Sequence, residues 1–166
     1  MIMRNNQKGF TLLEIIVIII IVGLLVALAI VKYISFTKYA EKGSVESVIG
    51  SLRSALGLYA ARQIINNQPI TAHNPFDDLA NKPPNYVGAF PDVDLSNCPP
   101  GSWAYQSGDP VNANWAVVVY RPKSTLTQAF NWGGVQWIIL AVSEVKNANG
   151  VTIGLSLDYY PPVPQW

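Results

Sequence analysis

Hydrophobic residues are concentrated near the N-terminus of the chain. Residues 15–31, IIVIIIIVGLLVALAIV, are seventeen consecutive apolar or small residues. With Phe10, Leu12 and Leu13 in front of it, the run reaches the length of about 20 residues that a helix needs to cross the hydrocarbon of a bilayer. We therefore expect a hydrophobic, membrane-spanning helix over residues 10–32.

The helical pattern continues beyond Lys32 in amphipathic form. Apolar residues recur there at steps of three and four, the spacing that places side chains on one face of a helix. They are Tyr39, Val45, Val48, Ile49, Leu52, Leu56, Tyr59 and Ile64. No proline interrupts residues 10–68, and Asn66-Asn67 before Pro69 is a typical helix stop. The pattern predicts one long helix whose second half packs against a globular head of residues 33–166.

The region of about 67–114 is expected to be irregular. Nine of the twelve prolines lie between Pro69 and Pro122, and asparagine, aspartate and glycine are frequent there. Such residues favour turns and loops. We expect this region to wrap the head and to cover one edge of a sheet.

The C-terminal third is predicted to form a sheet over residues of about 115–159. Apolar runs at 115–120 and 135–142 and strict alternation at 151–159 indicate strands. Asn149-Gly150 between the last two is a strong hairpin signal. The predicted fold class is α+β, with an antiparallel sheet packed on the amphipathic half of the long helix.

Glu14 is the single acid at the front of the apolar run, and a carboxylate near hydrocarbon is costly unless it is paired. Three interpretations of the segment compete: an uncleaved anchor, a signal peptide cut after Ala27-Leu28-Ala29, and a leader cut before the apolar run. Glu14 favours the third. Cleavage between Gly9 and Phe10 would create a charged amine four residues away, which could pair with Glu14 of a neighbouring subunit.

The stretch Lys8-Gly9-Phe10-Thr11-Leu12-Leu13-Glu14, followed by the long apolar run, resembles the type IV pilins and the pseudopilins of type II secretion. The resemblance implies that residues 1–9 are a leader, that a prepilin peptidase cuts after Gly9, and that Phe10 is then N-methylated. It also implies a pilin-like fold, in which residues 10–32 protrude and form the core of a filament, and a role for Glu14 in assembly.

The resemblance leaves two kinds of filament subunit open. One is a subunit of a type IV pilus-like filament, placed in the inner membrane, joined to identical or related subunits by an assembly platform, and exposed at the cell surface. The alternative is a pseudopilin of a periplasmic secretion filament. Pilins often close a C-terminal loop with a disulfide, which the single Cys98 cannot do, and this favours a pseudopilin or an atypical pilin. A third possibility is a secreted binding module released after Ala29.

Charge and reactive residues argue against several other functions. The net charge is +1, and removal of Arg4 and Lys8 with the leader leaves nine basic against ten acidic residues, or −1. Direct binding of nucleic acid is therefore not expected. One cysteine, Cys98, and one histidine, His73, with no paired carboxylates or phosphate loop, favour a non-enzyme without a cofactor. We expect Cys98 to be buried and His73 to be exposed in a loop.

Two further features carry weaker signals. Asp92, Asp94 and Ser96 have the alternating spacing of a calcium loop, but Asn97 and Trp103 stand where that loop needs glycine and glutamate. No metal is the preferred prediction, with calcium as a weak alternative. Gly43, Gly50 and Gly57 recur every seven residues on the predicted helix. They mark either a merely solvent-exposed face or close contact with adjacent subunits.

Overall fold

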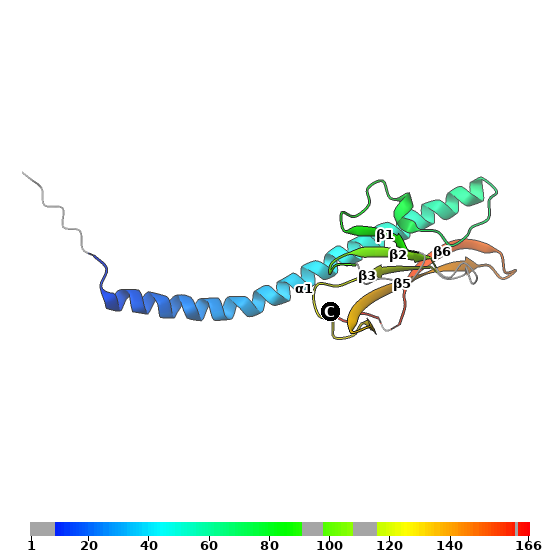
Figure 1. Cartoon of the computed structure of the whole chain (residues 1–166). Helices are drawn as coiled ribbons and strands as arrows, with labels where there is room; N and C mark the ends of the chain where they lie inside the picture. The colour runs from blue at the N-terminus through cyan, green and yellow to red at the C-terminus, as the bar shows by residue number, and fades with distance from the viewer. Residues whose placement is uncertain (1–8, 91–97, 108–115, 162) are drawn as a thin grey trace, which may run out of the picture. The chain divides into compact units, whose positions relative to one another are not determined.

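The structure is a computed structural model that describes residues 9–90, 98–107, 116–161 and 163–166. The chain divides into two compact units, Met1–Tyr39 and Ala40–Trp166. The elements, drawn in Figure 1, are listed by residue as α1 (Leu12–Ile65), the 3-10 helix η1 (Pro75–Asp78), β1 (Tyr86–Phe90), β2 (Trp103–Ser107), β3 (Ala116–Tyr120), β4 (Phe130–Trp132), β5 (Val135–Lys146) and β6 (Thr152–Tyr159).

Helix α1 is the long helix that the sequence predicts, and its segment within the second unit packs on the sheet. Val45, Ile49, Leu52 and Leu56 are almost fully buried. They share one hydrophobic core with side chains of η1, β2, β3, β5 and β6. The helix ends where expected, because Asn67 takes a left-handed conformation with φ 56° and Gln68 N–H donates to the Gln63 carbonyl. Such a bond satisfies a carbonyl that the helix end leaves open.

The sheet is mixed rather than antiparallel, which corrects the prediction. Its strand order is β1-β2-β3-β5-β4, and β6 also pairs with β5. All pairs are antiparallel except β1 with β2, which is parallel. A parallel pair needs a connection of a dozen or more residues. Residues 91–102 lie between these two strands and supply that length.

The region of 67–114 contains regular elements that the prediction missed: η1, β1 and β2. In β1, Gly88 breaks the pattern with a φ of 131° that favours glycine. In β2, four of the five residues are buried, so apolar and polar positions do not alternate. The expectation that this region covers a sheet edge is confirmed to the extent that β1 is the edge strand beyond β2.

The C-terminal strands lie close to their predicted positions. β3, β5 and β6 correspond to the runs at 115–120, 135–142 and 151–159, although β5 extends to Lys146 and Trp115 lies outside the described residues. Gly150, with φ 77°, is in the predicted hairpin turn. The short strand β4 was not predicted; a turn of Gly133 and Gly134, both with positive φ, joins it to β5.

The packing of α1 on the sheet gives a direct stability test. Leu52 is fully buried, whereas Leu58 on the same helix is 59% exposed. We expect Leu52→Ala to lower the free energy of unfolding by about 2–5 kcal/mol, because it removes core contacts and leaves a cavity. Leu58→Ala, the matched control, should change it by about 0.5 kcal/mol or less. Urea unfolding followed by tryptophan fluorescence measures both, and equal effects would contradict the assigned helix face.

Candidate functional site

The predicted cleavage point lies immediately before α1. Gly9 and Phe10 have no regular secondary structure and are exposed, Phe10 by 72%. A side chain added at Gly9 would meet no described atom within 4 Å. The bond between these two residues is thus accessible in an unstructured segment, as a peptidase requires. The preceding leader residues, 1–8, are outside the described part of the chain.

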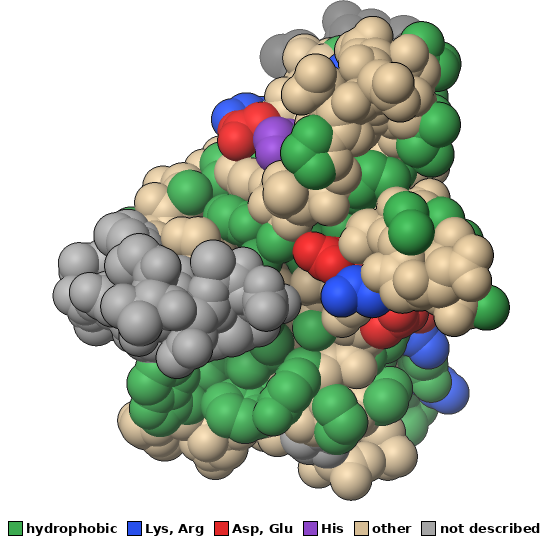
Figure 2. All heavy atoms as spheres, turned by 90° about the vertical axis from the view of Figure 1, so that its right-hand side faces the viewer, with side chains coloured by type: hydrophobic (Ala, Val, Ile, Leu, Met, Phe, Trp, Pro, Cys, Tyr) green, Lys and Arg blue, Asp and Glu red, His purple; other side chains and the backbone are tan. Residues whose placement is uncertain are grey.

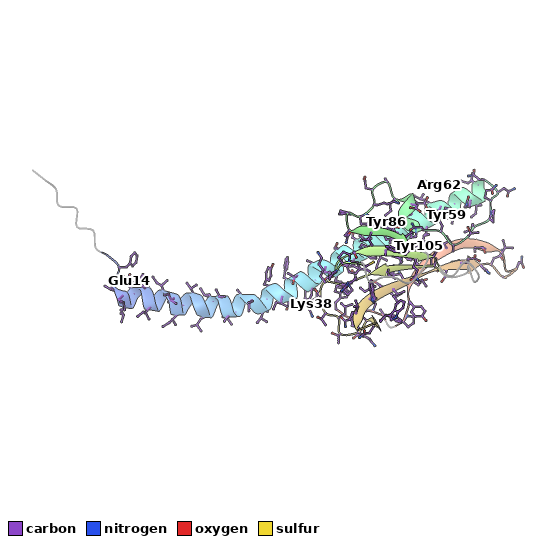
Figure 3. All side chains as sticks on the ribbon, in the orientation of Figure 1. Glu14, Lys38, Tyr59, Arg62, Tyr86 and Tyr105 are labelled. Atoms are coloured by element: carbon purple, nitrogen blue, oxygen red, sulfur yellow. The ribbon has the colours of Figure 1, made fainter. Side chains whose placement is uncertain are left out.

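Glu14 lies in the first turn of α1 (Figure 3). Its backbone N–H donates to the Thr11 hydroxyl at 3.2 Å, and Ile15 N–H donates to the Thr11 carbonyl at 3.2 Å. Thr11 is therefore the N-cap residue, and Thr11-Leu12-Leu13-Glu14 has the Thr-x-x-Glu spacing of a capping box. The Glu14 carboxylate also lies near the positive end of the helix dipole. This local role could have been recognised from the Thr-x-x-Glu signal, but the sequence analysis missed it.

The predicted partner of Glu14 is not formed in the uncleaved chain. Until the leader is removed, the nitrogen of Phe10 is a peptide nitrogen without charge. Glu14 itself is exposed. The helix start therefore places Phe10 and Glu14 near the same end of α1, while the pairing of the amine with a carboxylate from another subunit stays a prediction.

The apolar surface that follows Glu14 has no cover within the described chain. An 18-residue window of α1 has a mean hydropathy of 3.3, and none of it is buried. The large apolar side chains between Phe10 and Tyr39 are all at least 44% exposed. By length and composition this helix can cross a membrane. Exposed apolar area costs roughly 25 cal/mol per Å², so a membrane or other protein chains must cover it.

The N-terminal sequence matches a known family model. Residues 4–30 match the model described as the prokaryotic N-terminal methylation motif. The chain carries a prepilin-type methylation motif. The matched residues include the expected cleavage point at Gly9, the expected first mature residue Phe10, and Glu14. The motif covers the start of the first compact unit and leaves the head outside the match.

Proteins from two kinds of machinery are similar to this chain. A type II secretion system core protein G of Aeromonas hydrophila is 35% identical over 80 residues, which are 48% of this chain and 54% of that protein. The type IV narrow pilus major component PilA5 of Thermus thermophilus is 37% identical over 53 residues, 32% of this chain and 46% of that protein. A type IV major fimbrial protein FimA of Dichelobacter nodosus is 37% identical over 54 residues, 32% and 35%.

The chain spans about half or less of the length of these curated relatives. No solved structure matches it. The methylation motif and the relatives confirm the resemblance to type IV pilins and type II secretion pseudopilins.

The histidine of the head is not a freely exposed loop residue, which corrects that expectation. His73 stacks on Tyr59 with ring centroids 4.2 Å apart. Its Nε2 is 2.9 Å from Asp78 Oδ2, although the geometry is not that of a hydrogen bond. Arg62 approaches the other oxygen of Asp78 at 3.4 Å. These residues tie the end of α1 to η1, a structural rather than a chemical arrangement (Figure 3 shows Tyr59 and Arg62).

The remaining candidates give no reactive site among the described residues. Cys98 is buried, as predicted. No group of three or more metal-ligating side chains occurs in the described ranges, while Asp92, Asp94 and Ser96 lie outside them. On the face shown in Figure 2, acidic and basic side chains lie next to one another in small groups. An exposed example is the pair of Lys82 with Asp77 at 2.7 Å.

The three regularly spaced glycines of α1 are open to the surroundings. A Cβ at Gly43, Gly50 or Gly57 would meet no described atom within 4 Å. Close packing inside the described part of the chain therefore does not explain them. Contact with adjacent subunits stays a prediction beside the simpler interpretation of a solvent-exposed face.

Proposed function

We propose that this chain is a structural subunit of a type IV pilus-like filament. The carrying observation is the exposed apolar part of α1, which directly follows the prepilin-type methylation motif. A helix of this kind can be covered first by a membrane and then by the equivalent helices of other subunits. The proposed order is insertion in the inner membrane, cleavage after Gly9, N-methylation of Phe10, and polymerisation.

The proposed partners follow from these steps. A prepilin peptidase removes the leader, and an assembly platform in the inner membrane receives the mature subunit. Identical or related subunits then form the filament, in the periplasm or at the cell surface. The proposed role is that of a non-enzyme without cofactor, metal or direct nucleic-acid binding.

A pseudopilin of a type II secretion system is the second candidate. The observation that favours it is the extent of similarity: the Aeromonas hydrophila core protein G aligns over 80 residues, against 53 and 54 for the two pilus proteins. The longer alignment reaches beyond the methylation motif into the head. A secreted module released after Ala29 is a weaker third candidate, because it would discard the apolar helix.

Cell fractionation tests the proposed function and separates the two candidates. In the native organism, a pilus-like subunit is expected in filaments that shearing releases from the cell surface. A pseudopilin is expected to stay with the cells, and deletion of its gene should abolish the export of several proteins. The absence of any polymer, as judged by cross-linking in intact cells, would contradict both.

The leader assignment predicts a block in processing for Gly9→Val. A branched side chain directly before the cut should obstruct the peptidase, while the apolar helix still inserts. We expect the full-length precursor to accumulate in the inner membrane, visible as a larger band on an immunoblot. Gly23→Val, which lies within the apolar run and away from the cut, is the control and should be processed normally. Mature protein at the wild-type level from Gly9→Val would refute the assignment.

A further inference from the structure

Glu41 makes an unusual set of contacts for a helix residue. Its Oε1 accepts hydrogen bonds from the Tyr120 hydroxyl at 2.9 Å and from Lys123 N–H at 2.6 Å. Its Oε2 accepts from Ser124 N–H at 3.0 Å. One carboxylate of α1 therefore holds the end of β3 and two backbone amides of the loop that follows. Hydrogen bonds to a charged group are stronger than neutral ones.

The position of Glu41 along α1 gives these bonds their significance. The second compact unit begins at Ala40, so Glu41 is the second residue of the head. The next residue of α1 that is buried in the core is Val45, one turn further along. Between these two residues the turn contains Gly43, which has a low helix propensity and no described neighbour within 4 Å.

We propose that Glu41 is a latch that fixes the point at which α1 becomes part of the head. With the latch closed, the first helical turn of the head is held to the loop of residues 121–125. With the latch open, the apolar core holds α1 only from Val45 onward. The part of the helix that is free of the head then grows by about one turn, or 5.4 Å. This device belongs to the head and does not depend on the proposed filament function.

The chemistry of the partners supports a permanent latch. Burial of the Tyr120 ring, together with its hydrogen bond to Glu41, raises the pKa of the Tyr120 phenol. The phenol therefore stays protonated and remains a donor. All three partners donate, so only a group with two acceptor oxygens satisfies them. A glutamine at this position would turn an N–H₂ group toward at least one of these donors.

Hydrogen exchange on the mature chain in detergent micelles tests the latch, with mass spectrometry following separate segments. For Glu41→Gln we expect exchange about tenfold faster or more in two segments at once, residues 41–46 of α1 and residues 121–125 of the loop. Glu46→Gln is the matched control, because Glu46 lies on the same helix and makes only an exposed ion pair with Lys42 at 3.8 Å. It should leave the loop segment unchanged.

A second variant keeps the test decisive if Glu41→Gln unfolds the head. Tyr120→Phe removes one of the three donors and should accelerate both segments by a smaller factor, without a change in residues 138–142 of β5. Faster exchange in the loop alone would overturn the proposal, because the carboxylate would then bind the loop without holding the helix. Unchanged exchange in both segments of both variants would overturn it as well.

Discussion

Residues 40–166, expressed without the preceding chain, will form a soluble and mainly monomeric domain. This fragment keeps Glu41 and the buried helix residues Val45, Ile49, Leu52 and Leu56. It loses the exposed apolar run that would otherwise drive aggregation. Circular dichroism should show both helix and strand, and gel filtration should give the size of a monomer. The fragment should not polymerise.

A fragment that begins at Asn67 will aggregate or stay unfolded. Each fully buried apolar side chain contributes about 1.5–3 kcal/mol, so the four helix residues together contribute about 6–12 kcal/mol. That sum is comparable to the whole stability of a domain, about 5–15 kcal/mol. A stable, folded monomer of residues 67–166 in the same two measurements would show that the sheet does not depend on α1.

Replacement of Glu14 will leave leader cleavage intact and reduce assembly. Glu14→Ala keeps Gly9 and Phe10, so the peptidase should still act. We expect filament yield to fall about tenfold or more, since the loss of only about 1.4 kcal/mol per contact changes an equilibrium by that factor. The yield is measured in cells that lack the wild-type copy, as the amount of mature subunit in the cross-linked or sheared polymer.

Two further variants separate pairing from helix capping at Glu14. Glu14→Gln keeps a side chain that can complete the capping box but removes the charge. Thr11→Ala removes the cap but keeps the charge. If Glu14 pairs with the amine of Phe10 in another subunit, Glu14→Gln should assemble as poorly as Glu14→Ala, and Thr11→Ala should assemble better than both. Wild-type yield from Glu14→Gln would exclude the charge pair.

The helix and the C-terminal strands could be predicted from the sequence because their patterns are long and local. A seventeen-residue apolar run and repeated steps of three and four need no knowledge of the tertiary fold. The strands β1 and β2 could not be predicted in the same way. Their residues do not alternate, since most of β2 is buried, and the parallel pairing of β1 depends on a partner that lies across an irregular connection.

The candidate site shows the same division between local and long-range features. Gly9, Phe10 and Glu14 are adjacent in sequence, so a motif reveals them, and the Thr-x-x-Glu spacing would have revealed the cap. Glu41 gave no such signal. Its partners lie about 80 residues away, at Tyr120, Lys123 and Ser124. An acid on a helix face otherwise resembles any solvent-exposed residue.

The mature N-terminus, read by mass spectrometry of the membrane-associated protein from the native organism, tests the central claim most directly. A filament subunit assembled through its N-terminal helix must begin at Phe10 and carry a methyl group on its amine. A chain that begins at Ile30, or that keeps Met1 and the whole leader, would contradict the account.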